Sequence, residues 1–348
     1  MRNYFLAFVC SLLLTSICNA QSDAATQTSQ TAEINSPVAD EIDEVLIIGE
    51  QPGPRLWKVY KDDHVLWILG SFGPLPKKLT WRSHQAETAL TGSQELLLYP
   101  FAKPKLGFFT QLTVLPSFIG IKKNPEGARL EDVVPTDTYA RWLVLKEKYM
   151  GRNSSVEKYR PIFAGNELLE QALNKAELNA GDLALERVQE IAKKNNIKTT
   201  VPTVTFEMKQ PKQILKNFKQ AQIDDVACFT KMLDHLETDL DNTRLRANAW
   251  AIGDLEALSK LPITDHGSTC FQAVMNASFM DEESEIKKLP AALETEWLIS
   301  AEHALTNNAS SFAIVETHEI LKQDGLLNKL KTKGYRVEGF GFEPITTK

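Results

Sequence analysis

Two β-rich apolar runs separated by a polar turn stand near the start of the folded part of the chain. The runs "LWKVY" and "HVLWILG" flank the polar turn "KDD", which predicts a β-hairpin over residues 56–70. The next segment, "TWRSHQAETALTGS", has apolar residues at helical spacing, and the short apolar run "ELLLYP" at 95–100 is typical of a buried strand. This part is therefore predicted to run strand, strand, helix, strand.

The C-terminal part shows the same two periodicities. "SSFAIVET" is strand-like, "HEILKQDGLLNKLKTKG" is amphipathic and ends at Gly334, and "YRVEGF" is again strand-like. Such a β-α-β unit needs a crossover and therefore a sheet with parallel strands. Residues 105–305 are mostly helical in pattern, but the strand-like "TTVPTVTF" at 199–206 is a candidate to rejoin the sheet. We predict an α/β fold, a mixed β-sheet flanked by helices with a large helical middle section.

The N-terminus has the pattern of an export signal. Arg2 precedes an apolar run that ends at Ile17, and small residues follow up to Ala20. This predicts a signal peptide over residues 1–20 with cleavage near Ala20. Because Ile17 stands where a lipoprotein signal has a small residue, a lipid anchor is not expected.

A leader and one domain are predicted to follow. Residues 21–44 are polar and acidic without an aromatic residue, which predicts a flexible leader. The folded domain would then occupy residues 45–348, with the helical insert at about 105–305. No later apolar run is long enough to span a bilayer, so the mature chain is expected to be periplasmic or secreted without a membrane span.

Two cysteines remain after removal of the signal peptide, Cys228 and Cys270. A pair of cysteines in an oxidising compartment is more often bridged than free, so we predict a disulfide. The bridge would close a loop of about forty residues and stabilise the fold by about 3–4 kcal/mol. The alternative is two buried thiols.

Composition and charge limit the classes of function that this chain can have. The 348-residue chain is 43% hydrophobic and 24% charged, which is ordinary for a globular protein. Its formal net charge is −6, and no block of lysines or arginines stands out in the sequence. The chain lacks the electrostatic footprint of a protein that binds phosphate backbones, so we expect no nucleic-acid partner.

The second strand of the hairpin runs into the turn "GSFG". Gly70 and Gly73 could present amide N–H groups to an anion, as consecutive amides in tight turns do. The alternative, more frequent for isolated glycine turns, is close packing or a positive φ before Pro74. Ser71 lacks the Gly-x-Ser-x-Gly elbow of a hydrolytic nucleophile.

His318 opens the last predicted helix. The dipole at a helix N-terminus disfavours the charged imidazole, so His318 would be neutral and could act as a base. The alternative is an exposed residue on the first turn, with Thr317 as N-cap and Glu316 or Glu319 near the free amides. The other histidines show no metal-ligand spacing with one another or with the cysteines.

Two arginines of the helical middle are candidates to line a pocket. Arg246 lies four residues before Trp250 on one helix face, and Arg160 begins the segment "RPIFA". Both could bind an acidic group of a ligand. More often such arginines join helices to acidic neighbours.

The chain resembles the TraB/GumN family in several segments in the same order: "LWKV", "HVLWILGSFGPLPK", "WRS", "RPIFAGNELLEQAL", "RANAWAIGDLEAL" and "FAIVETHEILKQDGLLNKLKTKGYRVE". The resemblance extends from about Leu56 to Glu338. This family is related to the Tiki metalloproteases and is similar in fold to erythromycin esterases and the ChaN haem-iron proteins. The resemblance implies a mixed sheet with a pocket at the strand ends of the two halves.

Metal-dependent members of this wider group carry a Gly-x-x-His turn in each half and a glutamate after the strand that follows the first turn. Such ligands hold a divalent metal that can activate water. This chain has Gly73 at the first histidine position and Tyr99 near the glutamate position. Counting from "DGLL" places Glu319 at the second histidine position and Glu316 at its glycine, while a shifted helix start would place His318 there instead. We therefore expect no metal ligands and no cofactor.

Two function classes follow from the resemblance and its departures. The first is a non-catalytic exported protein that binds a peptide, small molecule or partner protein in the degenerate pocket; the second is an active hydrolase of the metallopeptidase type that uses His318 with Glu316 or Glu319. The missing ligands favour the first class, with the pocket beyond the strand ends. The residues expected to meet there are Gly70, Ser71, Gly73, Arg160, Arg246, Glu316, His318 and Glu319.

Overall fold

The structure, a computed structural model, describes most of the chain between residues 53 and 340. The described ranges are 53–79, 84–152, 154–179, 181–221, 223–238, 240–261, 266–277 and 285–340. The predicted signal peptide and leader lie outside these ranges.

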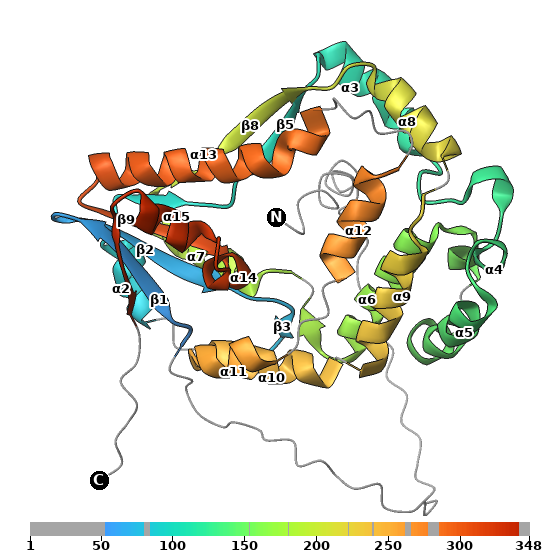
Figure 1. The fold of residues 1–348 in the computed structure, drawn as a ribbon, viewed down its shortest axis with the longest axis horizontal. Coiled ribbons are helices and arrows are strands. Elements are labelled where there is room, and N and C mark those ends of the chain that lie inside the picture. Colours follow the sequence, from blue (N-terminus) through green and yellow to red (C-terminus); the bar gives the residue numbers. More distant parts are fainter. Residues whose placement is uncertain are drawn as a thin grey trace, which may run out of the picture.

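A six-stranded mixed sheet forms the centre of the fold, in the order β10-β1-β2-β9-β4-β7 (Figure 1). Its strands are β1 (Leu56–Lys61), β2 (His64–Ser71), β4 (Glu95–Leu97), β7 (Lys198–Thr200), β9 (Ser310–Glu316) and β10 (Arg336–Phe340). β1 pairs antiparallel with both β2 and β10, and the pairs β2–β9, β9–β4 and β4–β7 are parallel. The predicted mixed sheet and hairpin are confirmed, and β9 and β10 run in one direction as the β-α-β unit requires.

The strand-like segment at 199–206 is divided between two sheets. Its first part is β7 at the edge of the main sheet, and its second part, β8 (Thr203–Glu207), pairs in parallel with β5 (Phe101–Lys105) in a separate two-stranded sheet. Pro100 and Pro202 stand at the two breaks, where proline offers no N–H to a ladder. A third sheet pairs β3 (Leu75–Pro76) with β6 (Leu178–Asn179).

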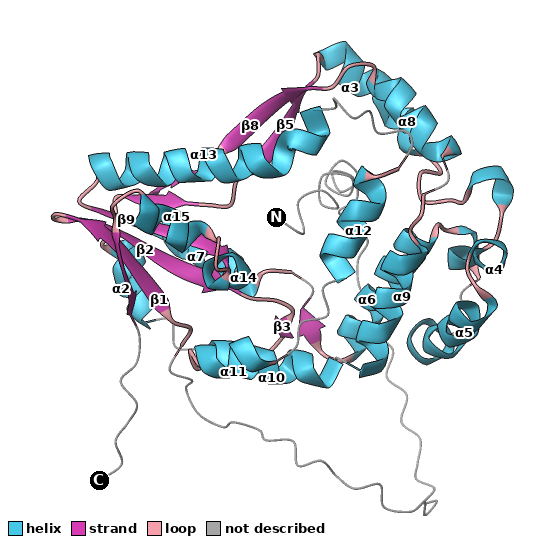
Figure 2. Cartoon of the chain, viewed as in Figure 1, coloured by secondary structure: helices cyan, strands magenta, loops and turns pink. Residues whose placement is uncertain are grey.

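Helices flank the main sheet and make up most of the middle section (Figure 2). They are α2 (His84–Thr91), α3 (Phe108–Val114), α4 (Leu130–Val133), α5 (Thr136–Met150), α6 (Pro161–Lys175), α7 (Leu183–Lys194), α8 (Pro211–Gln220), α9 (Val226–Thr238), α10 (Leu240–Ala251), α11 (Leu255–Lys260), α12 (His266–Met275), α13 (Glu285–Asn307), α14 (Thr317–Leu321) and α15 (Leu326–Thr332), with short 3-10 helices η1 (Leu115–Phe118), η2 (Pro125–Gly127) and η3 (Ser155–Lys158).

The amphipathic segment at 318–334 is two helices rather than the one that the periodicity predicts. α14 ends before Lys322, whose backbone is extended, and α15 begins after Gly325, which is also extended. Because two extended residues cannot continue a helical hydrogen-bond ladder, the chain bends between them. Each short helix then packs separately against the main core through Ile320 and Leu330.

The apolar residues form one main core at the sheet and a second core in the helical middle. Leu66, Ile68 and Phe312 of the sheet are fully buried in the main core. The second core surrounds Trp142 of α5, whose ring centroid lies 5.5 Å from that of Phe229 in α9. Within the described residues, no helix combines the length and the apolar character that crossing a bilayer requires.

A disulfide joins α9 to α12 through Cys228 and Cys270, as predicted. Both cysteines are buried and pack with Ile162, Met232 and Val274. The bridge therefore fixes α12 to the second core of the helical middle.

Candidate functional site

The two turns that were expected to meet lie side by side at the C-terminal ends of β2 and β9. In this parallel pair, Gly70 is the register partner of Val315, and Ser71 is the partner of Glu316. The Thr317 hydroxyl donates a hydrogen bond to the backbone carbonyl of Ser71 at 2.7 Å. The start of α14 is thus fixed to the end of β2, at the edge where open α/β sheets bind ligands.

Gly70 allows this close approach. A Cβ atom at this position would lie 2.7 Å from Oγ1 of Thr317 and 3.1 Å from Cδ1 of Ile320. The Gly70 carbonyl also accepts a hydrogen bond from the Trp250 indole at 2.7 Å. These contacts match the close-packing alternative of the sequence analysis, whereas a Cβ at Gly73 would meet only an ordinary contact, 3.5 Å from the Gly181 carbonyl.

Ser71 takes part in a buried chain of hydrogen bonds. Its hydroxyl is bonded to the hydroxyl of Tyr99, which donates to Oδ2 of Asp182 at 2.8 Å. Oδ1 of Asp182 caps α7 by accepting from the Leu185 amide at 2.9 Å. Burial raises the pKa of Asp182, and the nearby charge of Glu316 raises it further. The hydrogen bonds that Asp182 accepts lower its pKa, but their effect is smaller, so the pKa remains above its ordinary value. The Ser71 hydroxyl is therefore bonded to the Tyr99 phenol, and its hydrogen bond to Asp182 helps to lower the pKa of that carboxyl.

His318 lies between two carboxylates. Its Nδ1 is 2.9 Å from Oε2 of Glu316, and its Nε2 is 2.9 Å from Oε1 of Glu319. Burial alone would lower the pKa of His318, but the hydrogen bonds and charges of the two glutamates raise it above its ordinary value. Both ring nitrogens donate only in the imidazolium form, so this arrangement favours a charged His318 rather than the neutral base considered from the sequence.

Glu319 is bonded to a second cation, Lys322, whose Nζ lies 2.6 Å from Oε1. Burial alone would raise the pKa of Glu319, but the hydrogen bonds and positive charges of His318 and Lys322 lower it to about 2. The start of α14 therefore brings Glu316, His318, Glu319 and Lys322 into one ion-pair network.

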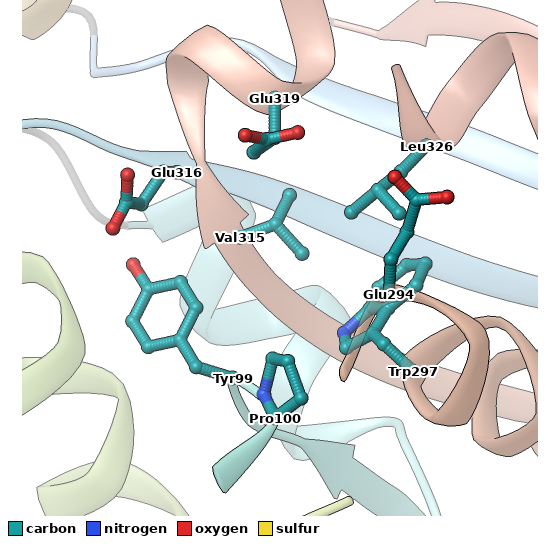
Figure 3. A pocket seen from close by; sticks show the side chains of 8 residues that line it. All are labelled: Tyr99, Pro100, Glu294, Trp297, Val315, Glu316, Glu319 and Leu326. Carbon is teal, nitrogen blue, oxygen red and sulfur yellow. The ribbon is translucent and has the colours of Figure 1, made fainter. Parts of the chain in front are cut away.

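A small recess opens beside this network, between the ends of β4 and β9 and helix α13 (Figure 3). Its volume is about 30 Å³. The residues that line it, here called the strand-end recess, are Tyr99, Pro100, Glu294, Trp297, Val315, Glu316, Glu319 and Leu326. The walls are thus largely apolar, with three carboxylates among them, and Figure 3 shows the Tyr99 hydroxyl directed toward Glu316.

Trp297 brings a hydrogen-bond donor to the recess. Its side chain comes from α13 and is only 1% exposed, yet its Nε1 has no hydrogen-bond partner. In Figure 3 this nitrogen faces the recess beside Pro100. A buried donor without an acceptor is costly, and such a group marks a place where a water or a ligand oxygen fits.

The two arginines that were expected at the pocket do not line it. The Arg160 guanidinium donates to the carbonyls of Phe218, Lys219 and Ala221 at 2.7–3.0 Å, which places it at the C-terminus of α8. The free carbonyls of a helix end attract a cation, and this explains the position of Arg160. Arg246 is buried in α10, where it donates to Thr243 at 3.0 Å.

The residues at the family's metal positions do not fit a divalent ion. Gly73 has no side chain, the Tyr99 hydroxyl is bonded to Ser71 and Asp182, and both nitrogens of His318 face carboxylates. Over the described part of the chain, no three histidine, cysteine, aspartate or glutamate side chains are grouped to hold a metal ion.

Sequence reasoning missed Asp182 and Trp297. Asp182 precedes a helical run, so the sequence could identify it as an N-cap but not as the acceptor of a hydrogen bond from Tyr99. Trp297 lies in a long helix with apolar neighbours, where any tryptophan is first assigned to the core. No local signal distinguishes a buried indole with a partner from one without.

The charged network predicts a pH dependence of stability. The raised pKa of His318 means that its contribution is fully present below pH 6.5 and is lost as the pH rises through the folded-state pKa. The lowered pKa of Glu319 means that its contribution is present above pH 4.5 and is lost as the pH falls toward 2. Urea unfolding should show both slopes, the alkaline one reduced in His318→Gln and the acidic one reduced in Glu319→Gln. An alkaline slope unchanged in His318→Gln would contradict this assignment.

Comparison with known proteins places the chain in a family. Neither a curated protein nor a solved structure matches it. The model of the TraB/PrgY/gumN family matches residues 55–339, a range that contains all strands of the main sheet except the last residue of β10. The chain therefore belongs to the TraB/PrgY/gumN family.

Proposed function

We propose that this protein is an exported, metal-independent member of the family that binds a peptide group at the strand-end recess. The observation that carries the proposal is the unpartnered indole N–H of Trp297 in a recess bordered by carboxylates. Export rests on the N-terminal sequence pattern, and the disulfide between Cys228 and Cys270 is compatible with an oxidising compartment.

The size of the recess limits what can enter it. Its volume of about 30 Å³ is only about two to three times the ~10–15 Å³ that one enclosed water requires. Only one functional group of a ligand can be enclosed, so the rest of the ligand must lie across the surface. This favours one unit of a chain molecule over a compact small molecule that needs a deep pocket.

The polar groups of the recess define the chemistry of that unit. The Trp297 indole needs an acceptor, while Glu294, Glu316 and Glu319 can only accept when ionised. A peptide unit carries a carbonyl acceptor next to an N–H donor, and a free N-terminal ammonium adds a positive charge. We expect the carbonyl to bind Trp297 and the N–H or ammonium group to bind a glutamate.

The state of His318 favours binding over hydrolysis. Contacts with Glu316 and Glu319 at both ring nitrogens raise its pKa and favour the protonated imidazole, whereas a general base must be unprotonated. The Ser71 hydroxyl is bonded to Tyr99 and the two ring nitrogens of His318 face glutamates, so Ser71 and His318 do not form a nucleophile and base pair. A hydrolase that uses His318 as a base would instead cleave the bound peptide.

Calorimetry with tri-alanine and its N-acetylated form tests the proposal. Trp297→Phe should weaken binding of tri-alanine by about tenfold, because a buried hydrogen bond is lost. Glu316→Gln should weaken the binding of the free peptide more than the binding of the acetylated peptide. Glu256→Gln is the matched control, because this glutamate lies on α11 with a side chain that is 78% exposed, far along the chain from the recess. A metal chelator should leave the affinity unchanged.

Different results would contradict peptide binding and support hydrolysis. No heat with either peptide in the wild-type protein, or equal affinities in Trp297→Phe and the wild-type protein, would overturn peptide binding at this recess. Cleavage of tri-alanine that disappears in His318→Gln would support the hydrolase instead.

A further inference from the structure

An apolar surface is exposed on α3 and η1, which line no part of the strand-end recess. Four side chains in this short stretch are exposed: Phe109 by 80%, Leu112 by 52%, Leu115 by 50% and Ile119 by 78%. Phe109 and Leu112 are three residues apart and share one helix face. These four residues are called the apolar ridge.

Lysines surround the apolar ridge in the sequence and in space. Residues 101–123 contain four lysines and no acidic residue, and residues 208–221 contain another four lysines and no acidic residue. The parallel pairing of β5 with β8 and the packing of α8 on η1 bring the two segments together. The eight residues, called the lysine collar, are Lys103, Lys105, Lys122, Lys123, Lys209, Lys212, Lys216 and Lys219.

The lysine collar is not neutralised by carboxylates of the described chain. None of its members forms an ion pair there, and Lys122 instead lies 5.9 Å from the centroid of the Tyr159 ring. The nearest acid in the strand register is Glu207, the partner of Lys105. A protein with a formal net charge of −6 thus concentrates positive charge around four exposed apolar side chains.

We propose that the apolar ridge and the lysine collar bind the surface of an anionic lipid bilayer. A bilayer matches both features at once, because apolar side chains can enter the boundary of the acyl chains while lysines remain among anionic headgroups. Figure 1 shows α3 and α8 at the outer edge of the molecule, where projecting side chains can reach a flat surface. The negative charge of the rest of the chain would turn this edge toward the membrane.

Co-sedimentation of the full chain with vesicles tests this proposal. The vesicles are phosphatidylcholine alone and phosphatidylcholine with about 30% phosphatidylglycerol, because the lysine collar should respond to anionic headgroups. We expect binding to the anionic vesicles, little binding to the neutral ones, and release at high salt.

Matched variants test whether the apolar ridge and the lysine collar themselves bind the vesicles, rather than any exposed apolar or basic residue. Phe109→Ser with Ile119→Ser should weaken binding by about tenfold or more, whereas Val144→Ser with Ile299→Ser, at side chains 69% and 54% exposed elsewhere, should not. Lys212→Glu with Lys216→Glu should also weaken binding, whereas Lys193→Glu with Lys194→Glu, the same charge change at the exposed end of α7, should not. Circular dichroism checks that each variant is folded.

Two results would overturn the proposal. If the wild-type chain does not bind anionic vesicles, the proposal of bilayer binding is wrong. An acidic protein partner then explains the same residues better. If it binds but the ridge and collar variants bind as well as their controls, the membrane contact lies elsewhere on the chain.

Discussion

Replacing Cys228 and Cys270 together by alanine is expected to lower the free energy of unfolding by about 4 kcal/mol. The bridge closes a loop with a sequence separation of 42 residues, so its removal increases the conformational freedom of the unfolded chain. It also removes two buried sulfur atoms from a small apolar cluster between α6, α9 and α12. Urea unfolding followed by circular dichroism measures the change.

A reductant supplies the control for this prediction. It should lower the stability of the wild-type protein by a similar amount and leave the double alanine variant unchanged. Wild-type protein whose two thiols react as free cysteines, or whose unfolding midpoint does not depend on reductant, would contradict the predicted bridge.

Gly70→Ala is expected to lower the free energy of unfolding by about 1–3 kcal/mol. The new Cβ would lie 2.7 Å from Oγ1 of Thr317, which holds the hydrogen bond to the Ser71 carbonyl. Thr317 is β-branched and stiff, so it cannot turn away without losing that bond. The substitution should therefore loosen the contact between β2 and α14 as well as reduce stability.

Gly73→Ala in the same turn is the matched control. Its new Cβ would lie 3.5 Å from the nearest atom, an ordinary contact, so the change in unfolding free energy should be small. Equal losses in the two variants would show that the turn, rather than the contact between Gly70 and Thr317, is sensitive to side chains.

The strand pattern could be predicted from the sequence because each strand is bounded by polar or breaking residues. The runs that became β1, β2 and β9 are apolar and only six to eight residues long, which is the length of a strand and too short for a typical helix. The periodicity also predicted one helix at 318–334, yet it contains no information on the extended backbone at Lys322 and Gly325. That break depends on tertiary packing, which overrides a continuous amphipathic pattern.

The candidate site could be predicted only where its parts follow from the register of the sheet. The meeting of Ser71 with Glu316 follows from two strands that end in recognisable turns. The position of Arg160 does not, because its partners are carbonyls of a helix more than fifty residues later. Asp182 and Trp297 likewise reach the site from α7 and α13, and the sequence gives no distance between such segments.

The lysine collar could not be predicted from the sequence either, because it depends on which segments meet in space. Along the sequence its lysines are spread over two segments, and neither forms a block of basic residues. Only the pairing of β5 with β8 brings them around one apolar ridge. Net charge and charge runs along the sequence therefore do not reveal a local basic surface of this kind.

Nuclear magnetic resonance of the tryptophan indole groups tests peptide binding at the strand-end recess most directly. The chain has six tryptophans, and the Trp297→Phe variant assigns the resonance of interest by its absence. Titration with tri-alanine should shift the Trp297 indole N–H downfield as it gains an acceptor, while the indole of Trp142, bonded to Glu157 in the second core, should not move. A Trp297 resonance that stays fixed at saturating peptide would contradict binding at the recess.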